Sequence, residues 1–226
     1  MLNAKCRMRI GRRSLAQFAF CILHFAFPCL AVTALAAAET IDRVLAVAAG
    51  ELITLSDVTA ARDFGLVAAG GAADPIGAIL AKLIDRELML SEVDRFAPPE
   101  PAADAIDREL QQVRARFPSA DAFDQALSRS GIDANHLRQT LRDNLRIRAY
   151  EDQRFTTPPP TDEELGRYYR DHPQTFMRQG QLAPFEAVRA DVARSMNDER
   201  RATLIADWLA GLRRRADVID LYLARR

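Results

Sequence analysis

The segment from residue 41 to residue 54 shows the first regular pattern of side chains. Up to Val47 the side chains alternate between two sets, the odd positions 41–47 and the even positions 42–46. The chain then reaches the pair Ala49 and Gly50. Alternation with a period of two is typical of a β-strand, and a small residue followed by glycine marks a turn. The pattern therefore predicts a short β-hairpin.

Beyond the hairpin the apolar spacing changes to three and four residues, which is typical of amphipathic helices. Thr54 and Asp57 have the spacing of a capping box and predict a helix over about residues 55–68. Asp74 in front of Pro75 predicts the start of a second helix. The later caps and stops predict further helices over about residues 102–117, between Ser119 and Gly131, and from Asp133 onward.

The run TTPPPT at residues 156–161 interrupts this series and predicts a stiff connector. Thr161 and Glu164 form a second capping box in front of another helix. Pro184 opens a helix of roughly 30 residues whose apolar positions have near-heptad spacing. Residues 216–223 resemble a final strand. The sequence thus predicts a mainly α-helical protein with strands near both ends.

Composition limits the class of protein. The 226 residues are 49% hydrophobic and 27% charged, which is enough apolar material for one or two packed cores. The 31 lysines and arginines balance 31 aspartates and glutamates, so the formal net charge is zero. This balance excludes a strongly basic nucleic-acid-binding protein, and we expect no nucleic acid among the partners.

The first 38 residues differ from the rest. All five of their charged side chains are basic, the first acidic residue is Glu39, and an apolar stretch over residues 15–35 runs into small residues up to Ala38. A basic, then apolar, then small-residue order predicts a secretory signal peptide over residues 1–38. Its removal would leave a chain with a net charge of about −5 and no stable membrane span.

An uncleaved signal anchor is the alternative for this head, because the apolar stretch is close to the ~20 residues that span a bilayer. His24 and Pro28 in the stretch and the alanine-rich exit favour cleavage.

Reactive side chains are sparse in the remainder of the chain. All three cysteines lie within residues 1–38, which excludes a disulfide or thiolate chemistry after cleavage. His136 and His172 lie on separate predicted helices and are interpreted as surface or cap residues. The sequence has no nucleophile elbow, H-E-x-x-H motif or glycine-rich phosphate loop. We therefore predict no catalytic residue, no metal site and no cofactor.

Five segments, taken in order, resemble the periplasmic chaperones of the SurA type. The resemblance implies a helical chaperone core in which the first and last strands pair in a small antiparallel sheet. It also implies a periplasmic location in a Gram-negative-type envelope. The five segments are IDRVLAVAAGELITLSDV (41–58), LAKLIDRELMLSEVDRF (80–96), the two helices of residues 123–155, TDEELGRYYRDHPQTF (161–176), and residues 182–223.

The domain organisation follows from this resemblance and from the connector. We expect a signal peptide over 1–38, an N-terminal helical chaperone domain with its leading hairpin over 39–155, and a proline-rich connector over 156–162. The C-terminal segment over 163–226, with the long helix and final strand, is expected to pack on the N-terminal domain.

Two features depart from the family. Only residues 177–181 stand where relatives carry a parvulin-like prolyl isomerase domain, and a domain needs at least ~50 residues. We therefore expect no enzyme activity. Ala49 stands before Gly50 where the family usually has asparagine, which leaves the turn type open.

The resemblance implies ATP-independent holding of unfolded polypeptides, such as outer-membrane proteins in transit, in a groove between helices. For each candidate groove residue taken individually, a position in the core is the preferred interpretation. The alternatives are a degenerate prolyl isomerase with residual activity and a fixed subunit of an envelope assembly complex. Homodimerisation through the long helix also stays open. The candidate peptide-binding residues are Met89, Phe96, Phe117, Phe123 and Phe155.

Overall fold

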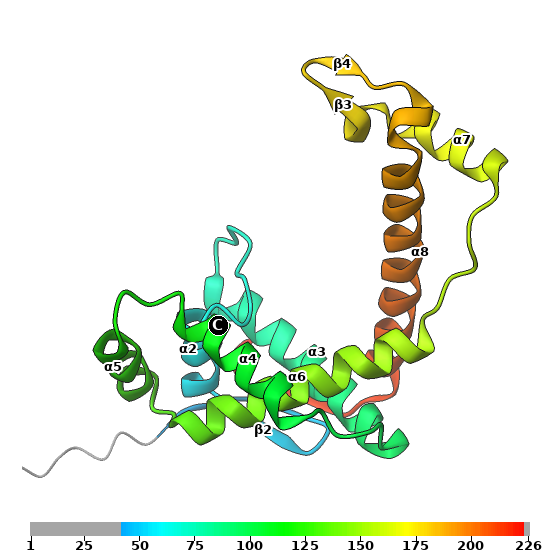
Figure 1. Cartoon of the computed structure of the whole chain (residues 1–226). Coiled ribbons are helices and arrows are strands. Elements are labelled where there is room, and N and C mark those ends of the chain that lie inside the picture. Colours follow the sequence, from blue (N-terminus) through cyan, green and yellow to red (C-terminus); the bar gives the residue numbers. More distant parts are fainter. Residues whose placement is uncertain (1–41, 224–226) are drawn as a thin grey trace, which may run out of the picture. The chain divides into compact units, whose positions relative to one another are not determined.

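The computed structural model describes residues 42–223, and its helices and strands are labelled in Figure 1. This part of the chain is 66% helical, so the predicted mainly α-helical class is confirmed. The predicted signal peptide lies outside the described residues. The helices are α2 (Leu55–Asp63), α3 (Pro75–Phe96), α4 (Ala103–Arg114), α5 (Ala120–Ser130), α6 (Ala134–Arg154), α7 (Asp162–Asp171), the 3₁₀ helix η1 (Pro173–Phe176) and α8 (Phe185–Arg215). The strands are β1 (Val44–Ala48), β2 (Glu51–Thr54), β3 (Met177–Arg178), β4 (Gln181–Leu182) and β5 (Val218–Asp220).

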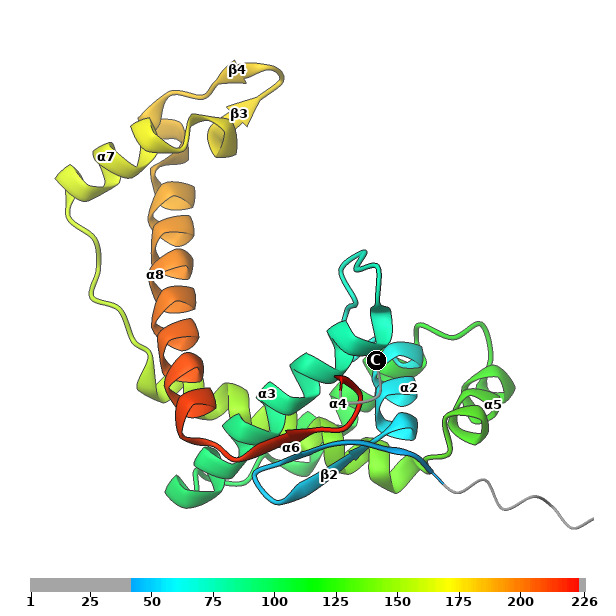
Figure 2. The same cartoon turned by 180° about the vertical axis from the view of Figure 1, so that it is seen from behind.

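Strand β1 lies in the middle of a three-stranded antiparallel sheet with the order β2-β1-β5. Ala48 pairs with Glu51 of β2 on one side and with Val218 of β5 on the other. The expected sheet of N-terminal and C-terminal strands is therefore confirmed, and Figure 2 shows the red C-terminal segment beside the blue hairpin. Ala46 and Ala48 are fully buried, and their small side chains let α3 pack closely on β1.

The turn at Ala49 and Gly50 joins β1 and β2, and its type does not follow from the sequence alone. Ala49 has φ +53° and Gly50 has φ +88°, so both central residues have positive φ, as a type I′ turn requires. Alanine lacks the tolerance of asparagine for this left-handed region. The turn geometry is thus that of an Asn-Gly hairpin, built with a less suitable first residue.

Helix α2 ends one turn earlier than predicted. The expected end near residue 68 is wrong, because the chain leaves the helix at Phe64, whose side chain is fully buried, and Gly65 has φ +61°. Arg116 stabilises this exit by donating hydrogen bonds to the carbonyl oxygens of Phe64 and Gly65, at 2.9 and 3.0 Å. The end of α2 is thus stabilised by a tertiary contact with a residue 51 or more positions further along the chain.

The final strand is also shorter than the predicted 216–223. The carboxylate of Asp220 accepts hydrogen bonds from the backbone amides of Tyr222 and Leu223, both at 2.9 Å, and the chain forms a turn directly after the strand. Tyr222 donates its hydroxyl to Asp74 at the start of α3. The end of the described chain is therefore fixed to the first turn of α3.

Four groups of buried side chains organise the described part of the chain, the smallest of them formed by Val93, Ile147 and Tyr150. The sheet core lies between the sheet, α2, α3 and the end of α8, and the helical core joins α2, α4, α5 and α6. The α7 core joins α7, η1 and the first turns of α8. The largest of the most buried members are Leu45, Ile79 and Leu80 in the sheet core, Phe64 and Leu137 in the helical core, and Phe176 and Val192 in the α7 core.

Helix α8 takes part in two of these cores. Val188 and Val192 near its start belong to the α7 core, whereas Leu212 near its end belongs to the sheet core. Arg213 forms a two-pronged ion pair with Asp85 of α3, with N···O distances of 2.6 and 2.5 Å. The C-terminal segment thus packs on α3. Across residues 42–223, no helix combines the length and apolar character that a bilayer crossing needs.

Candidate functional site

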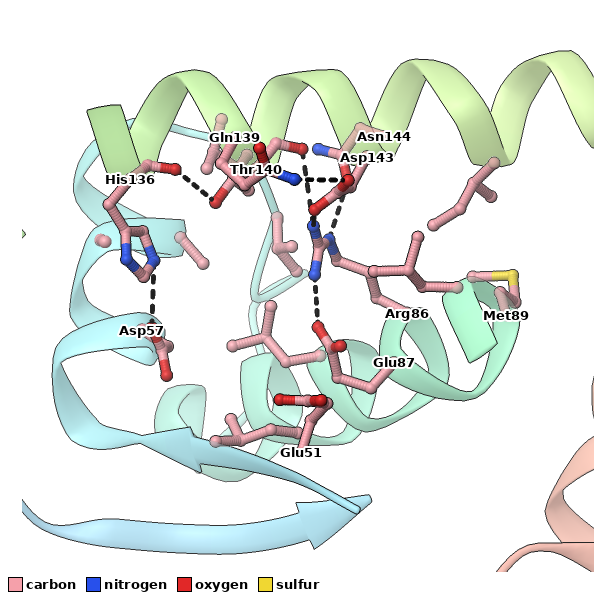
Figure 3. A pocket seen from close by; sticks show the side chains of 18 of the residues that line it. Glu51, Asp57, Arg86, Glu87, Met89, His136, Gln139, Thr140, Asp143 and Asn144 are labelled. Atoms are coloured by element: carbon pink, nitrogen blue, oxygen red, sulfur yellow. Dashed lines mark hydrogen bonds and ion pairs between the residues drawn. The ribbon is translucent and has the colours of Figure 1, made fainter. Parts of the chain in front are cut away.

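A cavity of about 720 Å³, partly open to solvent, lies between β2, α2, α3 and α6 (Figure 3). Its volume falls within the ~300–1,000 Å³ of ligand pockets. Helix α3 supplies one wall and α6 the facing wall, and the hairpin closes one end. The apolar side chains of the wall are Leu52, Ile53, Leu66, Val67, Leu83, Met89, Leu90, Ile132, Leu137 and Ile147.

Arg86 joins the two helical walls. Its Nε donates to the side-chain oxygen of Asn144 at 2.9 Å, and one terminal nitrogen lies 3.6 Å from the Asp143 carboxylate. The other terminal nitrogen binds Glu87, the next residue on α3. Because its side chain is only 16% exposed and all three nitrogens are engaged, Arg86 is a fixed part of the wall.

Asp57 and His136 face each other from α2 and α6, with 3.5 Å between the His136 Nε2 and the carboxylate. Asp57 also accepts hydrogen bonds from the backbone and hydroxyl of Thr54, both at 2.8 Å. Burial alone would raise the pKa of Asp57, but the hydrogen bonds from His136 and Thr54 outweigh it and lower that pKa. The hydrogen bond to Asp57 raises the pKa of His136, against the opposing effect of burial.

Glu51 and Glu87 place two carboxylates at the hairpin end of the cavity (Figure 3). Burial raises the pKa of Glu87, and Arg86 opposes this effect only in part. The negative charges of Asp143 and Glu51 add to the increase. The cavity therefore has an apolar wall and an end at which negative charge accumulates.

Two of the candidate residues named from the sequence lie in the helical core. Phe123 is 3% exposed, and its ring packs edge-on against Phe117, with 5.5 Å between the centroids. Both rings also contact Phe64 of the α2 exit. The two side chains fill the space between α2, α4 and α5, and neither lines the cavity.

The other three candidates lie around Tyr150 and Trp208. Phe155 is 8% exposed and packs on Trp208 at 5.3 Å, and Phe96 packs on Tyr150 at 5.6 Å. Phe96 is 59% exposed and borders a second cavity of about 250 Å³. Met89, which also contacts this group, is the one candidate of the five that lines the large cavity. The structure thus separates the five residues into two groups.

Sequence reasoning missed the polar residues of the cavity. Asp57 was interpreted as a helix cap, a role that it has, and His136 as a surface or cap residue, whereas the two side chains meet. The signal that could have found Arg86 and Glu87 is their position within the apolar segment LIDRELML of α3. Three consecutive charges in such a segment, those of Asp85, Arg86 and Glu87, need partners from another element.

Within residues 42–223, no three His, Cys, Asp or Glu side chains are grouped so that they could hold a metal ion. The chain matches no protein-family model and no curated protein.

Proposed function

We propose that the protein is an ATP-independent chaperone that holds apolar segments of unfolded polypeptides in the cavity between β2, α2, α3 and α6. The observation that carries this proposal is the cavity itself, about 720 Å³ in volume, partly open and walled by aliphatic side chains. When an apolar segment covers such a surface, the free energy falls by about 25 cal/mol for each Å² of apolar surface removed from water.

The state of the polar groups favours a polypeptide over a small polar metabolite. A pocket for a small polar molecule usually presents a few free polar groups that converge on it. Here Arg86 is held by Glu87 and Asn144, and Asp57 is held by His136 and Thr54. Because these groups already satisfy each other, the apolar wall supplies most of the available binding surface.

The wall also suits clients of varied sequence. Met89 and Leu90 are flexible or aliphatic side chains that are partly buried, and Leu52 at the rim is 60% exposed. Adaptable surfaces of this kind accept many apolar sequences. The resemblance to SurA-type chaperones supports the same function, with unfolded outer-membrane proteins as clients in the periplasm.

The test is suppression of aggregation when a urea-unfolded outer-membrane β-barrel protein is diluted into buffer with the purified chain. Leu52→Ser removes an exposed apolar group from the rim, so we expect weaker suppression of light scattering and an unchanged melting temperature. Leu204→Ser is the matched control, because Leu204 is 44% exposed on α8 and does not line the cavity. Equal suppression by wild type and Leu52→Ser would contradict the proposal.

Two further measurements separate the remaining alternatives. Turnover of a proline-containing peptide above the uncatalysed rate would favour a prolyl isomerase. Recovery of one partner at fixed stoichiometry from an envelope extract, without unfolded clients, would favour a fixed subunit of a complex.

A further inference from the structure

The lining of the cavity has an excess of negative charge. Five carboxylates and two guanidinium groups border it, together with the imidazole of His136. A partly open apolar cavity with this charge balance is not equally suited to all unfolded segments, because a cation lowers the electrostatic free energy of its walls and an anion raises it. The carboxylates are Glu51, Asp57, Glu87, Asp94 and Asp143, and the guanidinium groups are Arg86 and Arg148.

Both guanidinium groups are already engaged by the protein. Arg86 is held by Glu87, Asn144 and Asp143 within the wall. Arg148 binds both carboxylate oxygens of Glu109 on α4, at 3.1 and 3.4 Å, and Glu109 does not line the cavity. Arg86 is therefore unavailable to an anionic group of a client, and the charge of Arg148 is already offset by Glu109.

Three of the five carboxylates have similar partners. Asp57 is paired with His136, and Asp94 lies 2.7 Å from Arg146. Asp143 accepts a hydrogen bond from Gln139 at 3.0 Å and lies near Arg86. These groups need no further cation.

Glu51 and Glu87 differ from the other three. Glu51 is exposed at the start of β2 and makes no ion pair or side-chain hydrogen bond within the part of the chain that the structure describes. Glu87 shares its single partner, Arg86, with Asp143. The electrostatic repulsion between Glu51 and Glu87 raises the pKa of Glu87 beyond the effect of burial. The hairpin end of the cavity thus holds more negative charge than its own cations neutralise.

The apolar surface begins directly beside this charge. Ile53 follows Glu51 by two positions on β2, on the same face of the strand, and Leu83 precedes Glu87 by one helical turn on α3. An extended segment that enters at β2 therefore meets a carboxylate and aliphatic side chains on the same side of the cavity.

Building on the chaperone function proposed above, we propose that the cavity selects polypeptide segments in which a lysine or arginine lies next to apolar residues. The cation binds between the carboxylates of Glu51 and Glu87, and the neighbouring apolar side chains pack on Leu83, Met89 and Leu90. Segments with an acidic residue at the same place are disfavoured.

The test is fluorescence anisotropy with three labelled nine-residue peptides that share one apolar background and carry Lys, Gln or Glu at the centre. The full chain is expected to bind the Lys peptide about fivefold more tightly than the Gln peptide, which is the range of a partly exposed ion pair, and the Glu peptide most weakly. In Glu51→Gln the affinity for the Lys peptide should fall to that for the Gln peptide. Glu186→Gln is the matched control, because Glu186 is exposed on α8 and does not line the cavity.

The outcomes separate the two proposals. If the Lys and Gln peptides bind equally, or if Glu51→Gln keeps the preference, the charge selection is wrong and the chaperone function stands. If none of the three apolar peptides binds, the proposed function itself fails. A Lys peptide in a Gly-Ser background that binds as tightly as the apolar one would show a purely electrostatic site and would overturn the selection of mixed segments.

Discussion

The sheet core and the α7 core both use α8, but the chain closes them over very different distances in sequence. The buried side chains of the sheet core come from residues 45–88 and from Leu212, so this core closes only when segments far apart in the sequence meet. The buried side chains of the α7 core come from Leu165 to Val192 alone. A core closed by local segments can open without the rest of the protein, whereas a core closed by distant segments cannot. The cavity borders the sheet core, so its geometry depends on global folding.

Truncating one buried side chain in each core tests this contrast and should give the largest effect. Leu80→Ala removes a side chain that is 1% exposed and should lower the free energy of global unfolding by about 2–5 kcal/mol. Phe176→Ala should cost about 3–5 kcal/mol, confined to the α7 core. Hydrogen exchange measures both effects.

In Phe176→Ala we expect lost protection over residues 162–196 and unchanged affinity for apolar peptides. Equal loss of protection in the sheet core would show that the two cores unfold together and would remove the contrast.

Substitutions in two similar turns, one in each region, should give the next largest effect on stability. Ala49 and Gln179 have φ +53° and +52°, and each is followed by a glycine with positive φ. Asparagine tolerates this conformation better, so Ala49→Asn should raise global stability by about 1 kcal/mol. Gln179→Asn should stabilise the β3-β4 hairpin and leave the midpoint of global urea unfolding unchanged. A similar shift of that midpoint in both variants would contradict the contrast.

The pair of His136 and Asp57 should give the smallest effect, and only on the side of the cavity. Because the pKa of His136 is raised in the folded protein, its contribution to stability is complete below the unfolded value of 6.5 and is lost as the pH rises through the folded pKa. The urea midpoint of wild type should therefore exceed that of His136→Gln more at about pH 5.5 than at about pH 8. A difference that does not change with pH would exclude this linkage.

The sequence predicted the local features of the fold well. Both capping boxes form as expected, with 2.8 Å from the Thr54 amide to Asp57 and from the Thr161 amide to Glu164. Such contacts lie within three residues, so the local sequence contains all the information that they need. The long α8 after Pro184 is predictable for the same reason, because its apolar spacing is continuous.

The features that were missed depend on distant contacts. The end of α2 is set by Arg116, and the cavity is formed where Arg86 of α3 meets Asn144 of α6, 58 residues further on. Contacts between such distant residues leave no periodic pattern in the sequence. The choice of large aromatic residues as binding candidates also favoured packing residues, because buried rings such as Phe123 and Phe155 serve the cores.

The central position of β1 determines the order in which this protein can fold during its synthesis. β1 and β2 leave the ribosome well before β5, and Ala48 finds its second neighbour, Val218, only when β5 is made. Pairing over such a sequence separation is slow compared with local helix formation. The nascent chain therefore holds an incomplete sheet until β5 is made, and a product that lacks β5 would expose one edge of β1 to aggregation.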